Sequence, residues 1–472
     1  MKIEKTSSPR SRTSNGESAL VTPPSQARRR ANHTVVACQT GAMRPILGVL
    51  ALGVIVTACT GDRVDSPDLD ASGDRPAAPL VSDVDGLDQP MIRTTSGDQT
   101  GNRVTFGSGS LVGQPVTIEV RGATWLVGAP GVGDSTWWVV ADGSGQVSAF
   151  AVSNGMVSDL VPVGSLAAGQ PPVVAVADGM IALLTAPGSP LTAPALIDGV
   201  TISVATDGSV SLGGEYPTTL DVIALADSRV VVDRLGRAAV LSEPTDAYPH
   251  GVVGDEVEAR AVTVFDPVSG VILGTAEAPD GTVFEAIAPM WGDVDSDGVD
   301  ELVVTASDAT VGARLIAYEA DGSILAASAP VGTGNRWRNL LGVAPTGPNG
   351  RIEIIDVQTP HIGGILQWFA VEGSDLILRA AESQFSTHRI GTRNLDQGVV
   401  VDVDADGALD VLVPSQRQDR LLAWTRVDGG VEAVLDLELG STLATNIATA
   451  PKSDGSVAVG VGLADGRILM WP

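Results

Sequence analysis

A sequence pattern that recurs about every fifty residues constrains this chain more than any other feature. From residue 111 onward, an apolar segment leads into a tight turn that ends in glycine, and a second apolar segment follows. Seven copies are present, marked by Phe150, Val204, Phe265, Tyr318, Trp368, Trp424 and Trp471. Repeats of this length are typical of solenoids and propellers, in which each unit buries its apolar faces against its neighbours.

Half a repeat earlier, each copy contains two further apolar segments joined by a polar turn. These turns lie at 131–135, 177–180, 226–229, 293–301, 345–353, 402–410 and 451–456. Four strands in each of seven copies predict an all-β fold, a seven-bladed β-propeller of four-stranded blades. No segment has a helical apolar period, which excludes a helical solenoid. Two separate β-sandwiches are the alternative, because turn spacing alone also suits them.

The last copy stops at its third strand, so its blade needs an outer strand from elsewhere. The segment 116–120 precedes the first full copy and is free to supply it. We predict that this N-terminal strand pairs with 468–471 and closes the ring, because an unpaired sheet edge invites aggregation.

Residues 43–59 have the pattern of a bacterial export signal. Met43 and Arg44 precede an apolar run at 46–56 that is too short to span a bilayer, and small residues follow it. The sequence Val-Thr-Ala-Cys at 56–59 resembles the lipobox of bacterial lipoproteins, which implies that Cys59 is lipidated and becomes the mature N-terminus. A buried apolar segment with an incidental cysteine is the alternative.

These signals divide the chain into three parts. We predict an upstream extension plus lipoprotein signal peptide over 1–58, with Met43 as the true start. A flexible tether rich in Asp, Gly, Ser, Thr and Pro follows over 59–110, and the propeller occupies 111–472. The expected protein is a monomer held outside the cytoplasm at a bacterial membrane, either periplasmic or on the cell surface.

The net charge of the chain restricts the classes of partner that it can bind. It carries 29 Lys and Arg residues against 56 Asp and Glu residues, a net charge of −27, so we expect no nucleic-acid partner. Membrane attachment is therefore expected through the lipid on Cys59 rather than through a basic surface. The two cysteines of the chain cannot form a disulfide scaffold.

Two acidic turns predict metal binding. Both place oxygen-bearing side chains at positions 1, 3, 5 and 9 and glycine at position 6, and the carbonyl at position 7 is expected to contribute. The predicted ligands are Asp293, Asp295, Asp297, Val299 and Glu301 in the first turn and Asp402, Asp404, Asp406, Ala408 and Asp410 in the second. Clustered carboxylates repel each other without a hard cation, so we predict two structural Ca²⁺ ions. Merely solvated acidic turns are the alternative.

An EF-hand would need Glu at position 12, where this chain has Val304 and Val413, and strands rather than helices are expected on both sides. The pattern D-x-D-x-D-G-x-x-[DE] followed by an apolar strand resembles the FG-GAP or VCBS repeat of integrin-α-like propellers. Through the blade pattern, the resemblance covers most of residues 111–472. The acidic motif itself is intact in only two units.

Arg338-Asn339, Arg393-Asn394 and Thr445-Asn446 occupy equivalent places in successive copies, which would form an arc around the central channel. We predict a ligand site there that includes Arg336, Arg338, Asn339, Arg389, Arg393 and Asn394. His361 and His388 lie in one copy and are predicted to contribute to the site, with ordinary surface or loop histidines as the alternative. The arginines would form a positive collar for an anionic glycan or protein ligand. Alternatively, they pair with acids of neighbouring blades.

No catalytic set emerges from the sequence. Gly133-Asp134-Ser135 resembles a hydrolase fragment but falls in a predicted blade turn, with no histidine tied to it. We therefore predict a non-enzymatic binding or scaffold protein. The alternative is an extracellular lyase or hydrolase acting on polysaccharides or other polymers, with His361 and His388 in the channel.

Overall fold

The computed structural model describes residues 76–84 and 87–472, so the predicted export signal and Cys59 lie outside the described residues. Strands make up almost all the regular structure, and a short 3-10 turn, Pro348–Gly350, follows β25 (Arg338–Gly347). The all-β prediction is confirmed. No helix in the described part is long and apolar enough to cross a membrane.

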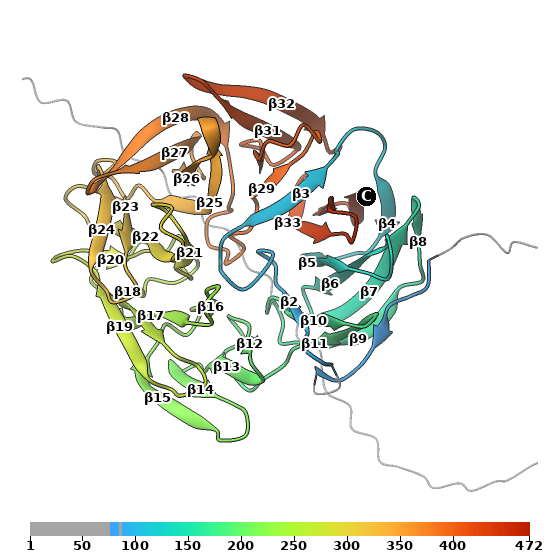
Figure 1. Ribbon diagram of the computed structural model, residues 1–472, viewed down its shortest axis with the longest axis horizontal. Coiled ribbons are helices and arrows are strands. Elements are labelled where there is room, and N and C mark those ends of the chain that lie inside the picture. Colours follow the sequence, from blue (N-terminus) through green and yellow to red (C-terminus); the bar gives the residue numbers. More distant parts are fainter. Residues whose placement is uncertain (1–75, 85–86) are drawn as a thin grey trace, which may run out of the picture. The chain divides into compact units, whose positions relative to one another are not determined.

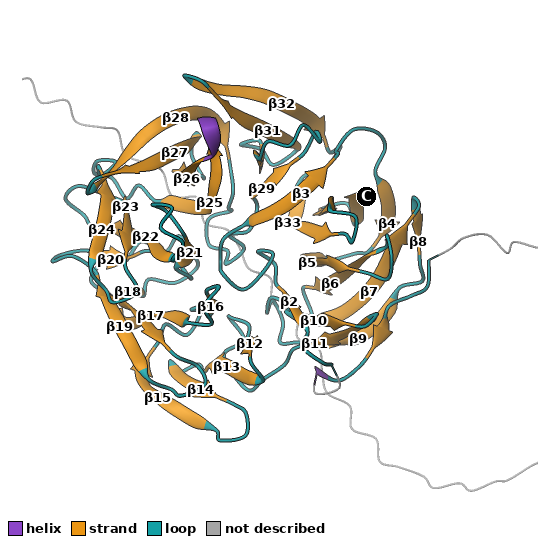
Figure 2. Ribbon diagram, viewed as in Figure 1, coloured by secondary structure: helices purple, strands orange, loops and turns teal. Residues whose placement is uncertain are grey.

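Grouped by their pairings, the strands form eight blades around a common centre, seven with four strands and one with five (Figures 1 and 2). Blade 1 contains β5 (Ala123–Pro130), β6 (Thr136–Asp142) and β7 (Gln146–Ser153), with β8 (Met156–Val157) and β9 (Val161–Ser165) sharing its outer edge. Blade 2 contains β2 (Met91–Arg93), β10 (Val174–Ala177), β11 (Met180–Leu183) and β1 (Leu80–Val81). Blade 3 contains β12 (Ala195–Ile197), β13 (Val200–Val204), β14 (Ser209–Leu212) and β15 (Thr218–Ile223). Blade 4 contains β16 (Val231–Val232), β17 (Ala238–Thr245), β18 (Glu258–Phe265) and β19 (Ile272–Glu277).

The second half of the ring follows the chain more simply. Blade 5 contains β21 (Met290–Gly292), β22 (Glu301–Ser307), β23 (Arg314–Tyr318) and β24 (Ile324–Ser328). Blade 6 contains β25 (Arg338–Gly347), β26 (Arg351–Gln358), β27 (Gly364–Glu372) and β28 (Asp375–Phe385). Blade 7 contains β29 (Val399–Asp402), β30 (Asp410–Pro414), β31 (Arg420–Val427) and β32 (Gly430–Glu438). Blade 8 contains β33 (Leu443–Pro451), β34 (Ser456–Leu463), β35 (Arg467–Trp471) and β4 (Val116–Glu119). The short β20 (Val283–Phe284) links blades 4 and 5.

The predicted number of blades, seven, is wrong, and the reason is that blade 2 is discontinuous in sequence. Only its middle hairpin, β10–β11, lies among the repeats, where it looks like part of the copy marked by Val204. Its inner strand β2 and outer strand β1 come from residues before 94. The boundary of the predicted tether is wrong for the same reason, because strands within 80–109 belong to the propeller.

The predicted pairing between the segment 116–120 and the last strand is present. Strand β4 runs antiparallel to β35, with Ile118 opposite Ile468. The strand before it, β3 (Val104–Gly109), pairs in parallel with both β29 and β34 and so bridges blades 7 and 8. Glycine is needed in β3 because a Cβ atom on Gly109 would lie 2.8 Å from the carbonyl oxygen of Asp402.

Buried apolar side chains fill the junctions between neighbouring blades, and this packing holds the ring together. Separate clusters join blades 1 and 2, 3 and 4, 4 and 5, 5 and 6, 6 and 7, 7 and 8, and 8 and 1. In the last of these, Leu126 of blade 1 packs with Ile468 of blade 8. No corresponding cluster joins blades 2 and 3 within the described part of the chain.

Candidate functional site

The two acidic turns occupy the same place in their blades, between the first and second strands of blades 5 and 7. In the first turn, carboxylate oxygens of Asp293, Asp295 and Asp297 lie within 4.8 Å of one another. Asp293 accepts hydrogen bonds from the backbone N–H groups of Ser296 and Gly298, at 2.7 and 3.1 Å. These bonds fold the turn so that its carboxylates face a common point.

The second turn has a similar cluster, in which the acid at position 9 takes the place of the acid at position 5. Asp402, Asp404 and Asp410 bring carboxylate oxygens within 4.8 Å of one another. Asp402 accepts from the N–H groups of Ala405 and Gly407 at 2.7 and 3.0 Å, as Asp293 does in the first turn. The matched bonds show that the two turns have one backbone design, which the spacing of their aspartates and glycine dictates.

The remaining predicted ligands also lie at these turns. Glu301 and Asp410, at position 9, accept the N–H groups of Val294 and Val403 at 2.8 and 2.9 Å. Position 5 and position 7 are linked in each turn, because Asp297 accepts the N–H of Val299 at 2.8 Å and Asp406 that of Ala408 at 2.7 Å.

The pKa values of the acids at position 9, Glu301 and Asp410, are raised, as expected for carboxylates that are buried beside other acids. Burial and the neighbouring Asp295 raise the pKa of Glu301 to about 8, and burial and the neighbouring Asp404 raise that of Asp410 to about 6. A bound divalent cation reverses both effects because it stabilises the ionised carboxylates. An all-oxygen donor set of this kind suits Ca²⁺.

Two arginines of the predicted collar, Arg338 and Arg393, are paired with acids. Arg338 is buried within blade 6, where its Nη1 donates to Asp356 at 2.7 Å and to Gln367 at 2.8 Å. Arg393 donates to Asp227 at 2.8 Å and to Asp255 at 2.5 Å. Both guanidinium groups are therefore paired with acids, which is the alternative that the sequence left open.

The other members of the predicted arc are scattered. Arg389 donates to the side chain of Gln418 and to the carbonyl of Leu443. Arg336 is exposed and donates to the carbonyl of Val331. Asn339 is buried and donates to Thr387 at 2.8 Å, and Asn394 accepts the N–H of Asp396 at 3.2 Å. Of the predicted set, Arg338 and Asn339 line a cavity at the centre of the ring, whereas Arg336, Arg389, Arg393 and Asn394 do not.

The centre of the ring is instead organised around Asp396, whose side chain is fully buried. Arg229 donates from Nη1 to both carboxylate oxygens, at 2.9 and 2.8 Å. Arg103 donates from Nε at 3.1 Å, and Thr95 from its hydroxyl at 2.6 Å. Burial alone would raise the pKa of Asp396, but the charges of Arg229 and Arg103 more than offset it and hold the pKa below its ordinary value.

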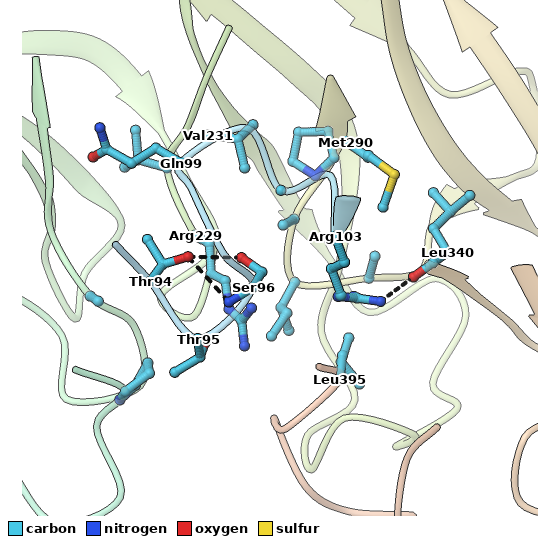
Figure 3. A pocket seen from close by; sticks show the side chains of 18 of the residues that line it. Thr94, Thr95, Ser96, Gln99, Arg103, Arg229, Val231, Met290, Leu340 and Leu395 are labelled. Atoms are coloured by element: carbon cyan, nitrogen blue, oxygen red, sulfur yellow. Dashed lines mark hydrogen bonds between the residues drawn. The ribbon is translucent and has the colours of Figure 1, made fainter. Parts of the chain in front are cut away.

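The segment 94–103 runs through this centre, between β2 and β3 (Figure 1). Beside it lies a cavity lined by the inner ends of blades 2 to 6 and by Leu395, into which Arg103 and Arg229 extend (Figure 3). Asn446 of blade 8 fixes the segment by donating to the carbonyl of Thr95 at 2.8 Å. Part of the channel is thus occupied by this segment, with the cavity beside it.

The side chains of the two predicted histidines, His361 and His388, are in contact. The Nδ1 atoms of His361 and His388 lie 3.3 Å apart, and His388 is held by the carbonyl of Thr392 at 2.7 Å from its Nε2. Trp337 stacks on His361 with ring centroids 5.9 Å apart. Burial lowers the pKa of both imidazoles, that of His388 to about 3, so His388 is neutral near pH 7.

Two further glutamates, Glu285 and Glu258, are buried, and Glu285 contacts the Trp337 ring that stacks on His361. Glu285 contacts His250 through one carboxylate oxygen, and its backbone carbonyl accepts the indole N–H of Trp337 at 2.7 Å. Glu258 is fully buried with neither carboxylate oxygen hydrogen-bonded. Burial and the nearby Glu285 raise the pKa of Glu258 to about 10, so it is protonated at neutral pH.

Sequence reasoning missed the central residues. Arg103 falls in the predicted tether, and Arg229 ends a segment taken as a blade turn. Asp396 lies two residues after the predicted Asn394, but nothing in its local sequence distinguishes it from the many acids at turns. Only the closed ring brings residues 103, 229 and 396 together.

Comparison with known proteins gives structural neighbours only. No protein-family profile matches the chain, and no curated protein matches it. BamB from Moraxella catarrhalis has a TM-score of 0.43 and 11% identity, covering 76% of this chain and 99% of that chain. BBS1N, solved in complex with ARL6DN, has a TM-score of 0.40 and 10% identity over 76% of this chain and 97% of that one. BamB and BBS1 are β-propeller proteins.

Raptor from Chaetomium thermophilum has a TM-score of 0.42 and 11% identity over 76% of this chain. The match covers 28% of Raptor, so this chain spans less than a third of that protein.

Proposed function

We propose that this protein is a monomeric lipoprotein, anchored outside the cytoplasm at a bacterial membrane by a lipid on Cys59, whose propeller binds or scaffolds a partner. The lipobox-like sequence that ends at Cys59 supports the anchor. The signal peptide would be removed, and the part of 59–75 after the lipidated cysteine would serve as the tether. We further propose that the pairing of β4 with β35 closes the ring.

The observation that carries the binding role is that segment 94–103 lies in the centre of the propeller, beside a cavity of about 60 Å³ that is too small for a large partner. Arg103 of this segment and Arg229 converge on the buried Asp396. The loops and outer faces of the blades are then the surfaces best placed to meet a large partner, such as an anionic glycan or a protein.

Calcium would stabilise this scaffold. We propose that the turns of blades 5 and 7 are FG-GAP or VCBS-like sites that each hold one structural Ca²⁺ ion. Equivalent hydrogen bonds occur in both turns, which supports the same metal-binding role for both. Extracellular modules bind Ca²⁺ with dissociation constants of about 10⁻⁴–10⁻³ M, which suits a protein outside the cytoplasm.

An array of glycans, peptidoglycan fragments and anionic polymers, probed with purified protein in Ca²⁺, tests the binding role. We expect specific retention without degradation of the retained polymer. Cell fractionation tests the anchor, because Cys59→Ala is expected to move the protein from the membrane fraction to the soluble fraction. Membrane association that survives Cys59→Ala contradicts the proposed anchor.

An enzyme acting on a polymer is the second candidate, favoured by the contact between His361 and His388 beside buried Glu285. Degradation of any polymer on the array, lost on His388→Gln but retained in Cys59→Ala, would support the enzyme over the scaffold.

A further inference from the structure

The cavity at the centre of the ring has an apolar wall. It encloses about 60 Å³, whereas a single water molecule needs about 10–15 Å³ by the same measure. Four prolines contribute to the wall, together with Ile287 and Leu395: Pro171, Pro172, Pro194 and Pro289. Proline has no backbone N–H, so this part of the wall offers a ligand apolar contact and no hydrogen-bond donor.

The polar side of the cavity carries one unbalanced positive charge. Arg103 and Arg229 both line it, and they share one carboxylate, that of Asp396. Arg338 also lines the cavity, but it is paired with its own buried carboxylate, Asp356. Asp98 also lines the cavity, but it is exposed and lies close enough to Arg93 for their charges to interact. Asp227, Asp255 and Arg393 form their own set of ion pairs and do not line the cavity.

Arg103 and Arg229 also have side-chain nitrogen atoms that make no hydrogen bond within the described residues. Arg103 uses Nε for Asp396 and Nη1 for the carbonyl of Leu340, and Arg229 uses Nη1 for Asp396 and Nη2 for the carbonyl of Arg393. Arg103 Nη2 and Arg229 Nε make no hydrogen bond within the described residues, yet neither is among the atoms sealed from solvent. They are therefore open to a ligand in the cavity.

We propose that this cavity binds a small monocarboxylate, with its carboxylate on Arg103 and Arg229 and its apolar part against the prolines. The planar guanidinium group matches the geometry of a carboxylate. One negative charge also balances the single excess positive charge, whereas a phosphate dianion exceeds it. The inference rests on the proposed binding role and gives that role a class of small ligand.

Titration calorimetry of the purified full chain with propionate and with propionamide tests the proposal. The two probes have nearly the same shape, so we expect propionate to bind at least about tenfold more tightly because of its charge. Ser96→Asp places a negative charge on the cavity wall without removing a partner of Asp396, and it is expected to abolish propionate binding. Arg417→Gln, at an exposed turn outside the cavity, is the matched control and is expected to bind as the unaltered protein does.

Arg229→Gln is also expected to lose propionate binding. Because this change removes a partner of the buried Asp396 carboxylate, its binding result counts only if the variant still melts cooperatively. Equal binding of propionate and propionamide, or full binding by a folded Ser96→Asp variant, overturns the proposal. Binding of inorganic phosphate without propionate overturns the ligand class. These results are independent of the fractionation of Cys59→Ala, so failure of the carboxylate site and failure of the proposed anchor are distinguishable.

Discussion

Ile118 lies directly opposite Ile468 in the antiparallel pair β4–β35, although the rest of the propeller separates the two residues in the sequence. Ile468 is fully buried at the junction of blades 8 and 1, and Ile118 packs against the same cluster. A single strand pair thus joins an early segment to the last blade.

Loss of this strand pair is expected to open the ring. Replacing 111–122 with a Gly/Ser linker of equal length should abolish cooperative melting, because blade 8 then has an unpaired edge and the junction with blade 1 loses apolar cover. Ile118→Asp should cost about 2 kcal/mol of unfolding free energy. Chemical denaturation followed by tryptophan fluorescence measures both effects. Val112→Ser, at an exposed position, is the control, and a linker variant that melts cooperatively at the original temperature refutes the closure.

Calcium is expected to raise the melting temperature of chelator-treated protein. The cation relieves the repulsion among carboxylates that lie within 4.8 Å in both turns. Asp295→Asn combined with Asp404→Asn should remove most of the shift, whereas Glu215→Gln, at an exposed loop, should not. Differential scanning calorimetry across a Ca²⁺ titration provides the measurement. Equal melting temperatures with and without Ca²⁺ in the unaltered protein would exclude both sites.

Glu258 is expected to make the protein less stable as the pH rises. Its pKa is about 10 in the folded protein against an ordinary value of 4.5, so the folded state keeps a proton that the unfolded state loses. The stabilising contribution is complete below pH 4.5 and declines as the pH rises towards 10. Glu258→Gln, which cannot ionise, should flatten this decline and gain about 2 kcal/mol at pH 8 relative to the unaltered protein.

Urea unfolding at several pH values between 5 and 9 measures this effect. Glu256→Gln provides the comparison because Glu256 is exposed on the same connection between β17 and β18. An unchanged pH profile for Glu258→Gln would show that Glu258 is ionised in the folded protein.

The junction of blades 2 and 3 is expected to open first. It lacks, within the described residues, the apolar cluster found between the other neighbouring blades. Backbone amides of β11 and β12 should therefore exchange with solvent faster than those of β30 and β34, which flank the packed junction of blades 7 and 8. Hydrogen exchange with mass spectrometry checks this order. Equal protection at the two junctions would mean that polar contacts alone hold blades 2 and 3.

Local sequence signals predicted the parts of this fold that are continuous in the chain. The aromatic strands and glycine turns of blades 5 to 8 recur in order, and the spacing of acids and glycine in two turns predicted clusters that the structure contains. Blade 2 was not predicted because its strands come from two distant segments, and the earlier segment is polar enough to resemble a tether.

The candidate site was less predictable because its geometry is set by the ring. Equivalent sequence positions predicted a collar that includes Arg338, yet the side chain of Arg338 turns into its own blade towards Asp356. Residues 103, 229 and 396 have no shared motif and meet only after eight blades have assembled. A local pattern specifies a strand or a turn, whereas it cannot specify which charges meet across a closed circle.

The route of the early segment has a consequence for how the protein is made. Within the described residues, β3 and β4 pair only with strands that are synthesised after residue 398. A nascent chain that leaves the ribosome or crosses a membrane N-terminus first must therefore carry these two strands without these partners until blades 7 and 8 emerge. A prematurely terminated product is thus left with bare hydrogen-bonding edges at both ends, a feature that proteases and chaperones can distinguish from the finished molecule.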